Sequence, residues 1–313
     1  MQKGQTELSA EEHSQRLKAI GLMCLAIVSF ALLDATAKWL VSEADVPVAQ
    51  VVWLRFAFHV VFSVVVLWPF AFPPSLASKK PGQQILRSLC MLGSTGFNFL
   101  ALRYLQLDQT ITIFFLTPLL VAALAGPLLN EWVGWHRMVA IIVGFTGVLL
   151  VMRPGFGGIH WAAFLSLAAT LSYALYNIST RYLAAFDPPA VTQTYSPLAG
   201  FLLAAPFAFY DWQAPDSPWM WLLFASLGLW GGLGHWLLIL AHRHAPAPIL
   251  APFTYFGLIF MSGLGFLLFR DVPSLWTLAG GAVVILSGLY LLARERIRMG
   301  PGKAGPAADI AAQ

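Results

Sequence analysis

The sequence predicts an all-α membrane protein with ten transmembrane helices, built as two inverted five-helix repeats. Three observations support this fold class: an apolar composition, a regular series of long apolar runs, and an internal repeat. The chain has 313 residues, of which 58% are hydrophobic and only 10% are charged, whereas a soluble domain carries about 25% charged residues. Most of the surface must therefore face lipid. The apolar runs do not alternate with a period of two, so they predict helices rather than barrel strands.

Ten runs are long and apolar enough to cross a bilayer, which takes about 20 residues. The connections between them are short, so consecutive helices should be antiparallel neighbours. The predicted spans are 19–40, 48–69, 86–105, 109–129, 135–152, 159–182, 189–209, 218–241, 246–269 and 275–293. They divide the chain into an N-terminal segment 1–18, a first repeat 19–153, a second repeat 159–293, and a Gly-, Ala- and Pro-rich tail 294–313 that we expect to be disordered.

The distribution of Lys and Arg supports this count. With the N-terminus in the cytoplasm, thirteen of the 18 basic residues, Arg87 among them, fall in cytoplasmic segments; four lie at the outer ends and Arg55 lies within a span. The positive-inside rule therefore predicts an inner-membrane protein with both termini cytoplasmic. A cleaved signal peptide is the alternative for the N-terminus, but Asp34, Lys38 and the many further spans favour an uncleaved first helix.

The internal repeat relates the two halves of the chain. At a spacing of 140 residues it matches Ala101 with Ala241, Arg103 with Arg243, and Glu131 with Asp271. At a spacing of 143 it matches Ser29, Phe30, Asp34, Lys38 and Gln50 with Ser172, Tyr173, Asn177, Arg181 and Gln193. Shared apolar composition could imitate a repeat, but charged residues that match at one offset argue against that. Five helices are an odd number, so the halves cross the membrane in opposite senses, as in many secondary transporters.

The A-x-R pattern before spans four and nine, Pro118, and the acidic residue that closes both spans resemble the drug/metabolite transporter superfamily, EamA type. The resemblance covers residues 19–293 and includes the Gly-rich spans five and ten. It implies a carrier of small metabolites, such as amino acids, nucleobases, sugars or cationic drugs, without choosing among them. One departure is Leu258, where the match to Pro118 would predict a second proline.

Ionisable residues within spans indicate a structural or functional role, because burial of each charge in lipid is costly. Asp34 and Lys38 are one helical turn apart on span one, and Arg55 and His59 have the same spacing on span two. Such pairs can neutralise each other. We favour this structural role for Lys38 and Arg55, whereas for Asp34 pairing and a role in the cavity remain equal alternatives. Asp34 and His59 are also the candidates for proton coupling.

Mid-span rings and amides form the predicted substrate site. His235 lies in the segment G-G-L-G-H-W, whose glycines leave room for a ligand or a close helix. A pocket lined by rings and a few polar groups suits a small aromatic ligand, although helix packing explains any single ring equally well. The predicted set is Asn98, Phe99, Tyr173, Tyr176, Asn177, His235, Trp236, Phe253 and Tyr255.

Prolines within spans mark possible hinges. Pro197 and Pro206 interrupt span seven, and Pro246, Pro248 and Pro252 gather at the start of span nine. Broken helices in transporters can expose backbone groups to a substrate or act as gates, and kinks that serve packing alone are the alternative.

The sequence therefore predicts a transporter of small metabolites that works by alternating access. Within the family, the ring-rich set resembles the YddG-type exporters of aromatic amino acids. Export of cationic drugs or nucleobases, proton-coupled through Asp34, is the alternative. No nucleophile with a base, no convergent metal ligands and no cofactor motif are visible, so an enzyme is not expected. The expected partners are a small-molecule substrate and the lipid bilayer, without nucleic acid, and two repeats in one chain could work as a monomer.

Overall fold

The computed structural model describes residues 2–67, 77–129, 135–152, 160–183, 185–244, 250 and 253–299, and the elements within them are helices. The helices of the first half are α1 (Gln2–Lys38) with the π-helical turn η1 (Trp39–Glu43), α2 (Val48–Phe62) with η2 (Ser63–Leu67), α4 (Pro81–Leu102), α5 (Leu107–Phe114), α6 (Thr117–Leu129) and α7 (Trp135–Met152). Those of the second half are α8 (Ala162–Leu183), α9 (Pro189–Tyr195), α10 (Leu198–Leu203), α11 (Ala205–Tyr210), α12 (Pro218–His244), α14 (Phe256–Phe269) and α15 (Leu275–Met299).

These helices confirm the predicted fold class. The pieces α5 and α6 form one crossing segment, and α9, α10 and α11 form another, so the described helices make ten segments. By length and composition alone, five continuous helices of the described chain can each cross a membrane: Leu17–Glu43, Val48–Val65, Pro81–Leu102, Ala162–Thr180 and Pro218–Leu238. The remaining segments are shorter apolar helices or are broken into pieces.

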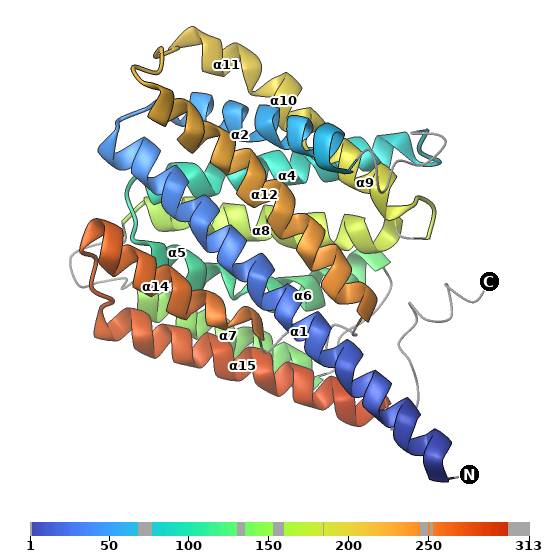
Figure 1. Ribbon diagram of the computed structural model, residues 1–313. Coiled ribbons are helices and arrows are strands. Elements are labelled where there is room, and N and C mark those ends of the chain that lie inside the picture. The colour runs from blue at the N-terminus through green and yellow to red at the C-terminus, as the bar shows by residue number, and fades with distance from the viewer. Residues whose placement is uncertain are drawn as a thin grey trace.

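The contacts between helices show the two-fold relation of the halves. The most extensive pairing, between α1 and α12, has its counterpart in the pairing of α8 with α4. Likewise α12 packs on α2 as α4 packs on α9 and α10, and α14 packs on α1 as α6 packs on α8. Figure 1 shows α1 and α12 crossing the front of the bundle with α4 and α8 behind them, while α7 and α15 lie together along the lower edge. The main helix pairs of the bundle therefore each combine one helix from the first half with one from the second.

The ends of the chain differ in detail from the prediction. Helix α1 already begins at Gln2, so the polar segment 1–18 continues directly into the first span. Helix α15 runs to Met299, five residues beyond the predicted start of the tail at 294. Arg, Glu and Met are good helix formers, which explains the extension. Residues 300–313 lie outside the described chain, and the division into segments stays a prediction.

Prolines break span seven where the sequence predicts it. A turn at Ser196–Pro197 separates α9 from α10, and α11 restarts at Ala205 with Pro206 in its first turn. Proline has no amide hydrogen and its ring clashes with the preceding turn, so it fits only at a helix start. Span four is also broken, at Phe115 and Leu116, just before Pro118. Pro246, Pro248 and Pro252 lie outside the described residues.

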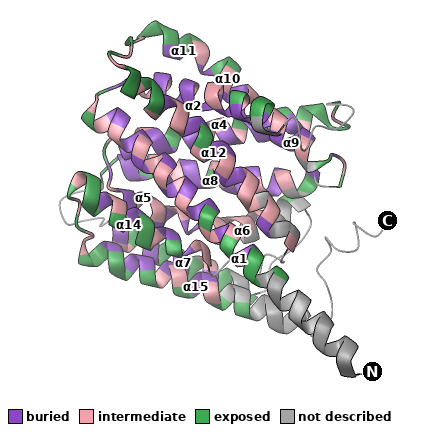
Figure 2. Ribbon diagram, in the orientation of Figure 1, coloured by how far each residue is buried: buried purple, intermediate pink, exposed green. Residues whose placement is uncertain are grey.

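Large apolar side chains cover the outside of the bundle. Figure 2 shows exposed residues on the outer faces of α7, α15, α10 and α11, with buried residues between the helices. Strongly exposed examples are Ile142, Leu202, Phe207, Leu267 and Leu286. In water such a surface would be unfavourable, so it indicates contact with lipid chains.

Helices α7 and α15 pack closely because both carry glycine at the crossing. A Cβ atom added to Gly280 would lie 2.5 Å from the backbone oxygen of Gly147 and 2.6 Å from Cγ2 of Val151. A Cβ atom added to Gly147 would lie 2.8 Å from the backbone oxygen of Gly280. No larger residue fits without moving the helices apart, so these glycines set the distance between them.

We expect Gly280→Ala to separate α7 from α15 and to cost about 1–3 kcal/mol of stability, the range for overpacked interiors. Thermal unfolding of the detergent-solubilised protein measures this cost. Gly263→Ala is the matched control, because a Cβ atom there meets nothing within 4 Å. Equal melting temperatures of the two variants would contradict the assignment of this contact.

Candidate functional site

Six rings meet at the centre of the bundle, and we call them the central ring cluster: Phe30, His59, Phe114, Tyr173, Tyr176 and His235. The His235 ring lies edge-on to Phe30, with centroids 5.0 Å apart, and is stacked parallel to His59 at 6.1 Å. Tyr176 lies 6.0 Å from His235, and Tyr173 stacks on Tyr176 at 5.7 Å. Phe114 closes the row at 5.8 Å from Tyr173. The cluster takes three rings from each half of the chain.

Glycines of α12 make this meeting possible, as the sequence suggested. A Cβ atom on Gly234 would lie 2.7 Å from the Phe30 ring, and one on Gly232 would lie 2.3 Å from the Phe62 ring. A Cβ atom on Gly228 would lie 2.3 Å from Cβ of Phe58. Helices α1 and α2 therefore pack directly on the backbone of α12, and this brings Phe30 and His59 to His235.

Asp34 and Lys38, for which pairing was one of two alternatives, do not pair with each other in the structure. Asp34 accepts a hydrogen bond from Nδ2 of Asn98 at 3.1 Å, whereas Nζ of Lys38 binds Oδ2 of Asp271 at 2.6 Å. Lys38 is the last residue of α1, and its long side chain reaches the segment after α14 rather than turning back along its own helix. Asp34 is therefore left without a lysine partner.

The predicted pairing of Arg55 with His59 is also not formed. Arg55 is 2% exposed and lies over the Phe56 ring, 4.3 Å from its centroid. Its Nε and Nη1 atoms have no hydrogen-bond partner among the described residues. The side-chain nitrogen of Gln193 lies 3.1 Å from Nε2 of His59, and Nδ1 of His59 has no hydrogen-bond partner among the described residues.

Arg87 is counted from the sequence among the basic residues of the cytoplasmic side, but in the structure its side chain is buried between helices. It lies in the second turn of α4 and is 2% exposed. Its guanidinium donates to Oγ1 of Thr180 at 2.6 Å, to the backbone oxygen of Thr192 at 3.0 Å, to Oγ of Ser196 at 2.7 Å, and to the hydroxyl of Tyr176. It also lies over the Tyr176 ring at 4.2 Å. Arg87 thus joins α4, α8 and α9 and orients one ring of the cluster.

Other residues of the predicted substrate set lie outside the cluster. Phe99 is 1% exposed in the main core, and Nδ2 of Asn177 donates to the backbone oxygen of Tyr173 in its own helix at 2.7 Å. Tyr255 packs edge-on against Phe115 at 5.1 Å, and Phe253 stacks on Phe256 at 6.0 Å. Trp236 follows His235 and is half-buried, without a ring contact among the described pairs. Asn98, Tyr173, Tyr176 and His235 are the members brought together around the cluster and Asp34.

The set of site residues predicted from the sequence lacks Phe30, Phe114, Arg87 and Gln193. A signal existed for two of them, because the repeat matches Phe30 with Tyr173 and Gln50 with Gln193. Gln50 is bonded elsewhere: its amide donates to the backbone oxygen of Gln213 at 2.8 Å and accepts from the Gln213 amide at 2.9 Å. For Phe114 and Arg87 no pattern distinguished them from other rings and flanking arginines.

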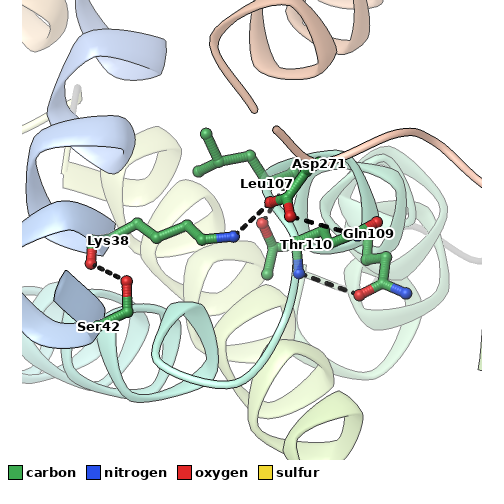
Figure 3. A network of polar contacts seen from close by, with 7 residues as sticks. Lys38, Ser42, Leu107, Gln109, Thr110 and Asp271 are labelled. Carbon is green, nitrogen blue, oxygen red and sulfur yellow. Dashed lines mark hydrogen bonds and ion pairs between the residues drawn. The ribbon is translucent and has the colours of Figure 1, made fainter. Parts of the chain in front are cut away.

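A polar network holds one end of the bundle, which we call the Lys38 end (Figure 3). Besides Lys38, the carboxylate of Asp271 accepts from Nε2 of Gln106 at 3.4 Å. Gln106 caps α5 reciprocally with Gln109, and its backbone amide donates to Oε1 of that residue at 3.0 Å. The hydroxyl of Ser42 donates to the backbone oxygen of Lys38 at 2.7 Å. The network joins α1, α5 and the end of α14.

A second network lies at the opposite end, which we call the Asp187 end. Asp187 follows α8 and is 5% exposed. Its carboxylate accepts from the backbone amide of Lys79 at 2.8 Å, from Nε2 of Gln84 at 2.8 Å and from the hydroxyl of Ser78. Burial by itself raises the pKa of Asp187, but these hydrogen bonds outweigh it and lower the pKa below its usual value. Asp187 thus ties the connection before α9 to the start of α4.

An inverted pair of five-helix repeats, with rings and unpaired polar groups gathered between the halves, defines a membrane transporter of small molecules rather than an enzyme. The chain belongs to the EamA-like transporter family, whose model matches residues 17–153 and 160–294. This confirms the resemblance to the drug/metabolite transporter superfamily.

Curated relatives cover nearly the whole chain. A riboflavin transporter of Vibrio cholerae is 27% identical over 86% of this chain and 91% of its own. An S-adenosylmethionine uptake transporter of Rickettsia felis is 27% identical over 90% and 95%. The pseudopaline exporter CntI of Pseudomonas aeruginosa is 23% identical over 86% and 94%. A solved crystal structure has the same fold, with a TM-score of 0.62 and 17% identity over 90% of this chain and 98% of its own.

We expect Asp271→Asn to destabilise the Lys38 end by about 1–3 kcal/mol, because it leaves the buried ammonium of Lys38 without its anion. The Lys38 and Asp271 side chains are 9% and 20% exposed, so the cost falls below that of a fully buried pair. Asp45→Asn is the control, since Asp45 binds Arg103 at the same end but is 78% exposed. Thermal unfolding measures both, and a larger loss in Asp45→Asn would refute the ranking.

Asp187 makes the stability of the Asp187 end depend on pH. Its pKa is lowered in the folded protein, so its stabilisation is complete above about pH 4 and is lost as the pH falls through the lowered pKa. We expect Asp187→Asn to be less stable than the wild type at pH 7, with the difference in melting temperature shrinking as the pH falls below about 4. Parallel curves for the two proteins would show that the carboxylate contributes nothing through its charge.

Proposed function

We propose that this chain carries a small metabolite with an aromatic or nitrogen-heterocyclic ring across the inner membrane, bound at the central ring cluster. The observation that carries the proposal is the composition of the cluster, which takes Phe30, His59 and Phe114 from one repeat and Tyr173, Tyr176 and His235 from the other. A site shared by both repeats is accessible in turn from either side when the halves move against each other, which is alternating access.

The ligands in the names of the relatives support a substrate that contains a planar ring. Riboflavin and S-adenosylmethionine both contain a planar nitrogen heterocycle with polar substituents. Tyrosine, phenylalanine and histidine rings bind such planes by stacked or edge-on contacts, and each ring pair adds about 0.5–1.5 kcal/mol beyond the buried area. A cofactor-like heterocyclic metabolite is therefore the first candidate substrate.

Aromatic or neutral amino acids, which we expected from the sequence as exported substrates, are the second candidate. They fit the same rings, and Asp34 supports them because it lies beside Asn98 without a lysine partner and could bind an ammonium group. The same feature supports the alternative of cationic drugs or nucleobases coupled to protons through Asp34. The names of the relatives include both an uptake transporter and an exporter, so direction is part of the assay.

The orientation of the chain in the membrane is part of the same proposal. The excess of Lys and Arg in the connections at the Asp187 end supports placing that end and both termini in the cytoplasm. The two repeats together surround the cluster, which supports a functional monomer.

The test is transport by the purified protein in liposomes, with labelled S-adenosylmethionine, riboflavin and tryptophan on either side. We expect saturable movement of at least one of them, and a loss of at least tenfold in kcat/KM in Tyr173→Ala and His235→Ala, because each removes a ring from the site. Phe253→Leu is the control, since its ring packs on Phe256 away from the cluster. Unchanged transport in both cluster variants would overturn the site, and loss in the control alone would move it to α14.

A further inference from the structure

We propose that Arg55 binds a carboxylate of the transported molecule, beside the central ring cluster, and that the substrate is a zwitterion with its positive group directed to Asp34. The inference rests on the proposed function and adds to it the charge of the substrate. It selects among the candidate ligands, because S-adenosylmethionine and aromatic amino acids carry a carboxylate next to an ammonium group, whereas riboflavin carries neither at neutral pH.

The first argument is that Arg55 is buried with free donors. Its side chain is 2% exposed, and Nε and Nη1 have no acceptor among the described residues. Guanidinium stays protonated in proteins, so it cannot escape this cost by losing its charge. The Phe56 ring below it gives a cation–π contact at 4.3 Å but accepts no hydrogen bond in the plane of the guanidinium. A buried charge without acceptors among the described residues is open to an acceptor on a bound ligand.

The second argument is the contrast with Arg87. Both arginines are 2% exposed and lie in helices of the same half. Arg87 donates from all three of its nitrogens, to Thr180, Thr192, Ser196 and Tyr176. This fold therefore surrounds a structural arginine with acceptors, as expected where no water is available. Arg55 departs from that rule at the place where the ligand should bind.

The third argument is the polar surroundings of Arg55. Tyr176 and Asp34 lie close enough to interact with its charge. Gly231 faces it, since a Cβ atom there would lie 3.4 Å from Nη2, in ordinary contact. Asn98, which donates to Asp34, keeps its Oδ1 atom free among the described residues. Donors at Arg55 and acceptors at Asp34 and Asn98 together match the carboxylate and ammonium of one α-amino acid.

Matched ligand pairs test this assignment. Binding to the purified protein in lipid nanodiscs is measured for L-tryptophan against tryptamine, and for S-adenosylmethionine against its decarboxylated form. Each pair differs by one carboxylate. We expect at least tenfold tighter binding of the carboxylate-bearing member of the pair that the protein recognises. Arg55→Gln should remove this ratio, and Arg55→Lys should restore part of it, because an ammonium keeps the charge but not the planar donor geometry.

Arg87→Gln is the control for a merely structural arginine. It should lower the melting temperature and weaken all ligands alike, without changing the ratio within a pair. A ratio near one in the wild type, or an unchanged ratio in Arg55→Gln, would overturn the inference while the ring site stands. If Arg55→Gln does not fold, the wild-type ratio and Arg55→Lys still decide. Absence of binding for every ring compound, riboflavin included, would instead overturn the proposed function.

Discussion

The structure depends on one constraint: inside lipid, a polar group must find its partner within the protein. Helices satisfy this for the backbone, and the side chains follow the same rule at most positions. Lys38 finds Asp271, Gln50 finds the backbone of Gln213, and Arg87 finds four acceptors. Exceptions among the described residues are found around the ring cluster, at Arg55, His59, Gln193 and Asn98, and single unpaired atoms also occur elsewhere, at Ser63, Gln84, Asp108 and Ser166. A transporter of polar molecules needs unpaired polar groups in its interior, because groups that are already paired within the protein are not available for hydrogen bonds to a substrate.

The inverted repeat brings related surfaces of the two halves together around the ring cluster. Helices α1 and α12 pair with each other as α8 and α4 do, and rings of α1, α8 and α12 belong to the ring cluster. The networks at the Lys38 end and at the Asp187 end hold helices that lead into this region. Neither half contains all six rings, so the ring cluster forms only where the halves meet.

The spans and the repeat could be predicted from the sequence because they depend on local properties. Hydrophobic length fixes a span, and charges that match at a constant offset mark a duplication. Side-chain partners could not be predicted in this way. Lys38 pairs across the bundle with Asp271 and not with Asp34 one turn away, and Arg87 turns inward although it lies near a helix start. These outcomes depend on how each helix is rotated about its axis, which only packing against neighbours decides.

The same limit explains the mixed outcome for the predicted rings. Tyr173, Tyr176 and His235 meet in the cluster, while Phe99, Phe253 and Tyr255 pack elsewhere. All six are mid-span rings of similar apolarity, so the sequence has no property that separates them. The glycines of α12 are the exception, because small residues in a row indicate a close helix crossing, and the crossing is where the cluster forms.

The two matched glutamines of the repeat have a consequence for the direction in which an empty carrier rests. The side chain of Gln50 forms two hydrogen bonds with the backbone of Gln213, whereas the side chain of Gln193 contacts the His59 ring. If the halves were chemically identical, exchanging their roles would cost nothing, and inward-facing and outward-facing molecules would be equally populated. The halves are not chemically identical here, because the residue that matches His59 at the repeat spacing is Leu202, which cannot hydrogen-bond through its side chain, so the exchange changes the free energy. In a carrier that works by alternating access, this difference would favour one orientation of the unloaded molecule, and the affinities measured from the two sides of the membrane would differ accordingly.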